Sequence, residues 1–252
     1  MLFASIGSGS KGNATLVKSA DTLLLIDCGF TIKETERRLQ QLGHTPADIT
    51  AILVTHEHGD HIKGVGPLAR KYQLPIYASH GTAQYDGLSK VPELNTINLE
   101  KPFSIANINI TPVAVPHDAR EPCQFVFRCN DKTFGLLTDL GSITPHVVKH
   151  YQQCDSLMLE CNHDTRMLSV GPYPPSIKSR VGGQWGHLNN QQAAMLLENI
   201  QTEQLQHLVI SHISVQNNTE QLARDAITRV YEKTEKLILA CQEEGVNWLE
   251  IA

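Results

Sequence analysis

Six apolar segments of this chain are each followed closely by a histidine or an aspartate, and this regularity constrains the fold more than any other feature. Short apolar runs of this kind are typical of buried strands. If the six strands run side by side in the same sense, their carboxyl ends meet at one edge of the sheets, where open sheets commonly bind ligands. The polar residues at these ends are Asp27, the histidine-rich loop 55–61, His117, Asp139, His163 and His212.

Strand and helix patterns predict how the chain is layered. Apolar runs and turn signals indicate the strands Leu2–Ile6, Ala14–Lys18, Thr22–Ile26, Ile49–Val54, Ile108–Val115, Phe125–Cys129, Thr133–Leu137, Ser156–Glu160, Leu205–Ile210, Lys236–Ala240 and Val246–Ile251. Caps and apolar faces indicate helices within residues 31–41, 64–72, 145–151, 189–199 and 219–235, whereas residues 162–187 are expected to be irregular. Many strands together with helices that have one apolar face predict an α/β (α+β) architecture of sheets covered by helices. No linker interrupts the pattern, so residues 1–252 are expected to form a single domain.

Composition and charge argue against several classes of protein. No apolar run approaches the roughly 20 residues that cross a bilayer, and the first residues lack the charged start and apolar segment of an export signal. The six cysteines form no CxxC pair, which favours reduced thiols in the cytoplasm. A net charge of −5 argues against a protein that coats nucleic acid with its whole surface. We therefore expect a cytoplasmic protein with no membrane partner and no obligate protein partner.

The segment 55–61, THEHGDH, places three histidines and an aspartate beside a glycine. Imidazole nitrogens and carboxylate oxygens are the common ligands of zinc and similar ions. Alternate residues of this motif can face one ion while the Asp60–His61 pair faces a second, and Gly59 is expected to allow the tight turn that this requires. Taken alone, the motif could also be a hydrated polar loop. No structural role asks for the matching residues after three later strands, so the whole pattern favours a metal site.

These residues resemble the ligand set of the metallo-β-lactamase superfamily, and the resemblance covers nearly the whole chain. It implies a four-layer αββα sandwich, in which two mixed β-sheets have helices on their outer faces and a two-metal site lies at one edge. It also implies that Asp139 bridges two divalent ions, zinc or manganese, and that Asp27 orients the histidine loop. The implied ligands are His56, His58 and His117 for the first ion and Asp60, His61 and His212 for the second.

Four further segments narrow the resemblance: SIGSGSKGN (5–13), LECNHD (159–164), GPYPPSIKSRVGGQWGHLNN (171–190) and SHISVQNN (211–218). Together they resemble the bacterial YycJ/WalJ group, phosphodiesterase-like members that are described as 5′→3′ DNA exonucleases. That group usually has GHLSN, whereas this chain has Asn189 in place of the serine. The resemblance therefore implies DNA or another phosphodiester as the substrate. The substitution at Asn189 puts one possible substrate contact in question, but it does not affect the residues expected to carry out the reaction.

The stretch 165–197 contains no Asp or Glu, but it does contain several cations and the aromatic rings of Tyr173 and Trp185. Cations suit phosphate oxygens and aromatic rings suit unstacked bases, so the stretch favours a phosphodiester that carries bases. The glycine-rich turn GSGSKGN adds a lysine and backbone N–H groups of the kind that cradle anions. The alternative is that the aromatic rings only pack a loop while the cations lie in solvent. The candidate substrate contacts are Ser10, Lys11, Asn13, Lys178, Arg180, Trp185 and Asn189.

The implied reaction is hydrolysis of a phosphodiester by a hydroxide that bridges the two ions. Asp60 would bind metal and orient the hydroxide, and His187 would stabilise the developing charge or protonate the leaving 3′ oxygen. His163 is a weaker candidate for a supporting or substrate contact. Two alternatives stay open. One is a glyoxalase-II-like or lactonase-type acyl hydrolase that acts on a small thioester or lactone, and the other is a regulatory binding module without turnover.

Overall fold

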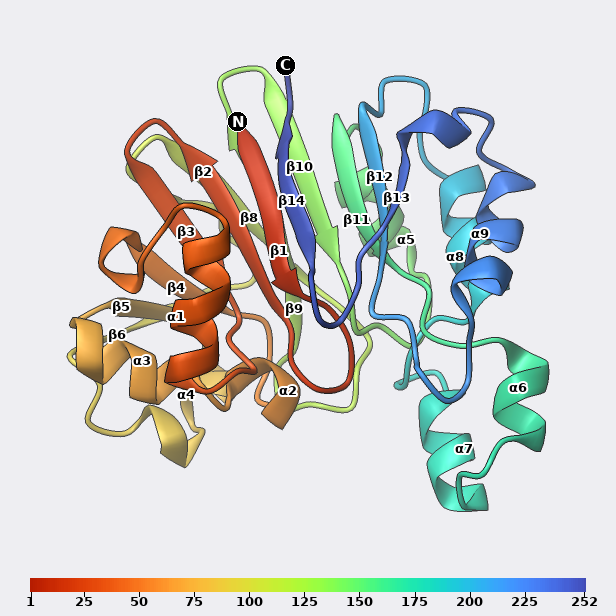
Figure 1. Ribbon diagram of the computed structural model, residues 1–252, viewed down its shortest axis with the longest axis horizontal. Helices are drawn as coiled ribbons and strands as arrows, with labels where there is room; N and C mark the ends of the chain where they lie inside the picture. The colour runs from red at the N-terminus through yellow and green to blue at the C-terminus, as the bar shows by residue number, and fades with distance from the viewer.

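A computed structural model describes residues 1–252, and its strands form two mixed sheets that pack face to face (Figure 1). The first sheet has the strand order β14-β1-β2-β3-β4-β5-β6. Its strands are β1 Leu2–Gly7, β2 Ala14–Ser19, β3 Thr22–Ile26, β4 Ala51–Val54, β5 Pro75–Ser79, β6 Glu93–Ile97 and β14 Val246–Glu250. The first and last strands of the chain are neighbours, so the two termini lie close together in Figure 1.

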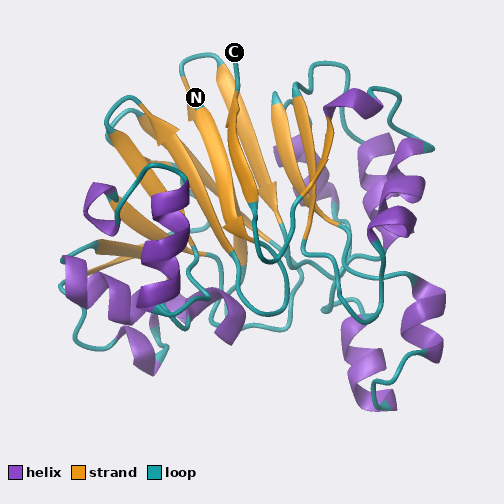
Figure 2. Ribbon diagram, viewed as in Figure 1, coloured by secondary structure: helices purple, strands orange, loops and turns teal.

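The second sheet has the strand order β13-β12-β11-β10-β9-β8-β7. Its strands are β7 Phe103–Ile105, β8 Ile108–Ala114, β9 Cys123–Cys129, β10 Lys132–Leu137, β11 Ser156–Glu160, β12 His207–Ser211 and β13 Leu237–Leu239. Figure 2 shows the strands as a central block with helices on both sides. The predicted αββα sandwich of two mixed sheets between outer helices is confirmed.

Helices cover the outer face of each sheet. On the first sheet lie α1 Ile32–Gln41 and α3 Val65–Tyr72, and on the second lie α5 Pro145–Tyr151, α8 Asn190–Glu198 and α9 Glu220–Thr228. The remaining helices are α2 Gly59–Ile62, α4 His80–Ala83, α6 Thr165–Val170, α7 Pro175–Val181 and the 3₁₀ turns Pro46–Asp48, Asp86–Leu88 and Thr234–Lys236. None of these helices has both the length and the apolar character that a membrane span requires.

An apolar layer joins the inner faces of the two sheets. Phe3 of the first sheet stacks on Phe134 of the second with their ring centroids 4.2 Å apart, and Phe127 lies next to Phe134 at 5.9 Å. All three rings are buried, and packed aromatic pairs add roughly 0.5–1.5 kcal/mol to the free energy of burial. This layer fixes the distance between the strand ends that the two sheets bring to their common edge.

Within each sheet the pairing confirms that the strand ends point the same way, and the 3.2 Å contact between His61 and Asp139 shows that the ends of both sheets meet at one edge. β3 and β4 are parallel neighbours, as are β10, β11 and β12. β8 runs in the direction of β10, because β9 pairs antiparallel with both. At these ends Asp27, Asp139 and His212 have φ angles of 60°, 53° and 51°. This left-handed conformation costs roughly 1–2 kcal/mol per residue, so the surrounding structure holds the three side chains at the edge against a local backbone cost.

Three parts of the predicted secondary structure are wrong. Residues 162–187 are not wholly irregular but contain α6 and α7, because the Asp164 side chain accepts from Met167 N–H to cap α6 and Pro175 opens α7. The helix expected over 219–235 ends at Thr228, after which the chain turns so that Tyr231 enters the core. The sequence patterns do not predict β5, β6 and β7. β5 is short and begins at a proline, which is uncommon inside a sheet. β6 and β7 are edge strands with exposed residues, so neither has a continuous apolar run.

Candidate metal centre

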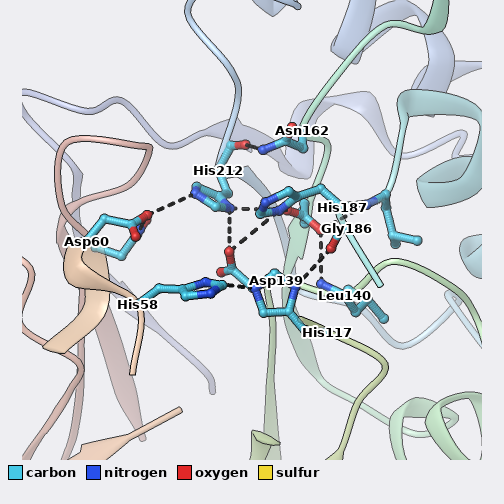
Figure 3. Close-up of polar contacts among 12 residues, drawn as sticks. His58, Asp60, His117, Asp139, Leu140, Asn162, Gly186, His187 and His212 are labelled. Carbon is cyan, nitrogen blue, oxygen red and sulfur yellow. Dashed lines mark hydrogen bonds and ion pairs between the residues drawn. The ribbon is translucent and has the colours of Figure 1, made fainter. Parts of the chain in front are cut away.

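Three histidine nitrogens converge at the carboxyl edge of the sheets, and Figure 3 shows part of this arrangement. His58 Nδ1 lies 3.1 Å from His56 Nε2 and 3.2 Å from His117 Nε2. The far nitrogens of two rings are occupied, since His117 Nδ1 donates to the Gly186 carbonyl and His56 Nδ1 donates to Thr55 Oγ1, each at 2.9 Å. The Thr55 hydroxyl accepts there because it donates its own proton to a carboxylate. The converging nitrogens therefore present lone pairs to one centre, an arrangement that a cation stabilises.

A second group of ligand atoms comes from Asp60, His61 and His212. Asp60 Oδ2 lies 3.6 Å from His61 Nε2 and 3.7 Å from His212 Nε2. Asp27 fixes the His61 ring, because its Oδ2 accepts from His61 Nδ1 at 2.8 Å and its Oδ1 accepts from the Thr55 N–H at 2.8 Å. Asp27 is buried, so this contact sets the orientation of the ring and turns His61 Nε2 toward the site.

Asp139 lies between the two groups. Its Oδ2 is 3.2 Å from His61 Nε2, and its Oδ1 is 3.1 Å from His212 Nδ1. Although burial opposes ionisation, His212 and His61 hold the pKa of Asp139 well below its usual range. Asp139 Oδ2 is buried and has no hydrogen-bond partner, which costs about 1–3 kcal/mol unless another group binds there. A carboxylate oxygen that faces histidine nitrogens in this way fits a metal ion.

The ligand atoms fall into compact groups. Within each group they lie no more than 4.8 Å apart, and the groups are His56–His58–His117, Asp60–His61–His212, His56–His61–Asp139 and Asp139–Glu160–His187–His212. Burial lowers the pKa of His56 and of His117, which keeps both rings in the neutral form that binds metal. The neutral imidazoles of His56 and His117 and the ionised carboxylate of Asp139, gathered at one buried edge, fit divalent cations.

Glu160, which the sequence patterns do not single out as a site residue, joins two of the histidines. Its Oε1 accepts from His187 Nδ1 at 2.7 Å and from His212 Nδ1 at 3.1 Å, while its Oε2 accepts from the N–H groups of Leu140 and Leu188. Burial opposes ionisation of Glu160, but His187 and His212 lower its pKa to about 2. The carboxylate therefore orients both rings. Its signal in the sequence is a charged residue that ends the otherwise apolar strand SLMLE.

A cavity of about 320 Å³ opens beside these groups, a volume at the small end of ligand sites. Its lining includes metal-ligand candidates and His187, together with Tyr173 and residues of α7. Arg180 of α7 forms an ion pair with Asp118, and its Nη2 lies 3.4 Å from His58 Nε2. A guanidinium group and an aromatic ring therefore line, together with the candidate ligands, a space of small-molecule size.

Some of the predicted substrate contacts lie at this cavity. Ser10 and Arg180 line it. Asn13 lies behind the ligands, where its Nδ2 is 3.2 Å from Asp60 Oδ2 and 3.0 Å from His61 Nε2. His163 is buried, and its Nδ1 has no hydrogen-bond partner. The β1–β2 loop thus brings a hydroxyl to the cavity and an amide to the ligand groups.

The other predicted substrate contacts are not among the residues that line this cavity. Lys11 is exposed and lies 3.8 Å from Glu243. Lys178 Nζ donates to the Ser169 carbonyl at 2.7 Å, within the segment that carries α6 and α7. The Asn189 side chain accepts from the Gln192 N–H and caps α8. Trp185 lines a second groove.

The expected need for glycine at position 59 is wrong. Gly59 is the first residue of α2, it does not have a positive φ, and a Cβ placed on it would meet nothing within 4 Å. The change of direction comes from His58, which is extended with φ −65° and ψ 145° just before the helix. The motif therefore changes direction through an ordinary helix start.

Comparison with known proteins agrees with the fold. Residues 22–213 match the family model described as Beta-lactamase superfamily domain. The chain is 36% identical over 237 residues to Exodeoxyribonuclease YycJ of Bacillus anthracis, covering 92% of this chain and 89% of that protein. It is 33% identical over 227 residues to Exodeoxyribonuclease WalJ of Streptococcus pneumoniae, covering 88% and 84%. The crystal structure of the metallo-β-lactamase fold protein YhfI from Bacillus subtilis has a TM-score of 0.76 at 20% identity, with 99% of both chains covered.

The chain therefore belongs to the β-lactamase superfamily, as a hydrolase with the metallo-β-lactamase fold. Within that superfamily its relatives are the YycJ and WalJ proteins, and the similarity extends over most of the chain. The resemblance to the superfamily and the narrower resemblance to the YycJ/WalJ group are therefore both confirmed.

Proposed function

We propose that this protein is a metal-dependent phosphodiesterase that removes nucleotides from the 5′ end of DNA. The observation that carries the proposal is the convergence of ligand atoms at the sheet edge, beside a cavity that Arg180 and His187 also line. A guanidinium group and a histidine beside metal ligands suit the charge of a phosphate group. The names of the YycJ and WalJ relatives, both exodeoxyribonucleases, support DNA as the substrate. Six unpaired cysteines support a reducing compartment such as the cytoplasm.

The residues of the edge would hold two divalent ions, zinc or manganese. The proposed ligands are His56, His58 and His117 for the first ion, Asp60, His61 and His212 for the second, and Asp139 for both. When bound, the ions would lower the pKa of water and neutralise charge on the phosphate oxygens. Histidines suit zinc, and the carboxylates also suit manganese.

Asp60 and His187 would handle the protons. Although burial opposes it, the neighbouring His212 and His61 rings keep the pKa of Asp60 below its usual value, so the carboxylate stays ionised and can orient the attacking water. His187 donates from Nδ1 to Glu160, and although burial opposes protonation, Glu160 raises the pKa of the ring. A protonated ring at the cavity can donate from Nε2 to the leaving 3′ oxygen.

The test uses DNA labelled at either end, with zinc or manganese added to the purified protein. Release of nucleotides from the 5′ end that stops when a chelator is added would support the proposal. His187→Ala should keep its metal, measured by mass spectrometry, but lose roughly 10²- to 10⁴-fold in turnover. The matched control is His207→Ala. His207 begins β12 at the end away from His212, and its ring contacts the Glu250 carbonyl. Cleavage of a thioester or lactone without cleavage of DNA would contradict the proposal.

A further inference from the structure

We propose, on the basis of the proposed function, that the groove beside Trp185 holds the single-stranded part of the DNA as it continues away from the metal edge, with an unpaired base stacked on the indole ring. The groove has a volume of about 880 Å³ and includes Leu99, Pro112, Pro116 and Trp185 in its lining. The Trp185 residue is 62% exposed. An indole left this open beside a groove with apolar residues in its lining is suited to bind a flat apolar group.

The loop that carries Trp185 also forms part of the metal-edge cavity. Gly186 and His187 line that cavity, whereas the preceding residue, Trp185, lines the groove. The loop therefore separates the two spaces by a single turn of backbone. A strand whose scissile phosphate lies near His187 would need to pass only this loop to reach the indole ring.

Backbone contacts hold this loop in place. The Gly186 carbonyl accepts from His117 Nδ1 at 2.9 Å, and the Gln184 carbonyl accepts from Ser142 Oγ at 3.2 Å. Gly141 packs so closely that a Cβ on it would lie 2.4 Å from Gln184 O and 2.4 Å from Gly186 N. The indole thus projects from a backbone that is anchored to two of the strand ends of the site, which fixes its position relative to the candidate ligands.

The charges in the groove favour bases over phosphates as the groups that enter it. Its lining includes Lys101, His146 and His150, but also Glu100 and Glu121. Glu121 already accepts from the Gly81 N–H at 2.6 Å. A groove with mixed charge and an open aromatic ring suits stacking, which depends little on sequence and requires bases that are free of a duplex. The proposed occupant is therefore single-stranded DNA.

Intrinsic fluorescence can test the contact without any turnover, because the chain has two tryptophans. The metal-loaded Trp248→Phe protein retains only Trp185, and a hydrolysis-resistant phosphorothioate oligothymidylate of about ten nucleotides should quench its emission. The same oligonucleotide annealed to its complement should quench it far less. The matched control is Trp185→Phe, which retains Trp248, a side chain that donates to the Leu42 carbonyl. Equal quenching in both proteins, or none in either, would overturn the proposal.

Kinetics supply the second measurement. Trp185→Leu should raise KM for the longer unmodified oligonucleotide by roughly five- to hundredfold, with a much smaller change for a dinucleotide that is too short to reach the groove. Equal changes for the two substrates would overturn the proposal.

Loss of self-association in Trp185→Leu, with unchanged DNA binding, would also overturn it and assign the indole to a protein contact. Absence of metal-dependent cleavage by the wild-type protein would instead refute the proposed function, while the fluorescence titration would still decide whether DNA occupies the groove.

Discussion

The two sheets contribute to the candidate metal centre in different ways. The first sheet supplies its ligand candidates from one short loop, residues 55–61, and Asp27 holds that loop through His61 and Thr55. The second sheet supplies single residues from the ends of β8, β10 and β12, and Glu160 orients His187 and His212 there. The first half of the site therefore depends on local backbone geometry, whereas the second half depends on the correct assembly of several strands.

Loss of the residue between the halves should have the largest effect. Asp139→Asn removes the negative charge that lies 3.2 Å from His61 and 3.1 Å from His212. We expect no measurable turnover and loss of bound metal. An ion present at about 100 times its dissociation constant stabilises a protein by about 2.7 kcal/mol, so the rise in Tm on adding zinc should disappear in this variant. Metal content and thermal unfolding with and without zinc would check both results, and an unchanged Tm shift would show that Asp139 is not shared.

A substitution at Glu160 should weaken only the half of the site from the second sheet. In Glu160→Gln one acceptor oxygen becomes an NH₂ group, so one pair of its four N–H partners is left without an acceptor. Loss of such an orienting contact typically lowers metal affinity or activity 10- to 100-fold, and we expect a change near 100-fold. The measurement is a zinc titration together with kcat on labelled DNA.

Asp155→Asn is the matched control for this change. Asp155 precedes β11 at the end opposite Glu160, and its Oδ2 accepts from the Thr133 N–H at 2.7 Å. The control should lower the free energy of unfolding by about 1 kcal/mol but leave metal affinity unchanged. A similar loss of metal affinity in both variants would mean that Glu160 acts through the stability of β11 and not through the histidines.

The difference between the sheets also explains what the sequence could predict. The loop motif is contiguous, so its residue types and spacing identify it directly. His117, Asp139 and His212 could be predicted only because each follows an apolar strand and those strands share a direction, which the pairing of β8, β10 and β12 confirms. Their distances from the first-sheet loop 55–61 depend on the apolar layer between the sheets, including the Phe3–Phe134 contact, and no local pattern encodes them.

Residues whose roles depend on three-dimensional neighbours escaped prediction. Glu160 ends a strand like the metal-ligand candidates do, but its part in the site appears only once His187 and His212 lie beside it. Conversely, Lys178 and Asn189 lie in a segment whose composition suits phosphate binding, but their side chains have other partners. Lys178 donates to a carbonyl in its own segment, and Asn189 caps α8. Composition identified a basic, aromatic segment, but it could not tell which side chains face the cavity.

The loop 184–187 should be more sensitive to crowding than the helical segment that precedes it. In Gly141→Ala the new Cβ would approach Gln184 O and Gly186 N to 2.4 Å, so the loop must shift. This shift would move the Gly186 carbonyl away from His117, and we expect kcat on labelled DNA to fall roughly tenfold. In the control Gly182→Ala the nearest atom is the flexible Leu168 side chain at 3.2 Å, and kcat should change little. Equal losses in the two variants would show that the loop is not specifically anchored.

The smallest effect is expected in the loop from the first sheet. Gly59→Ala places a methyl group where nothing lies within 4 Å, at the first position of α2 and without a left-handed φ. Alanine is favoured over glycine in helices by up to about 1 kcal/mol, so Tm should stay the same or rise slightly while metal affinity stays within about twofold. Zinc titration and thermal unfolding would measure both. A large loss of metal affinity would show that the loop needs a flexible glycine when it binds the ion, and the contrast with the crowded Gly141 position would then fail.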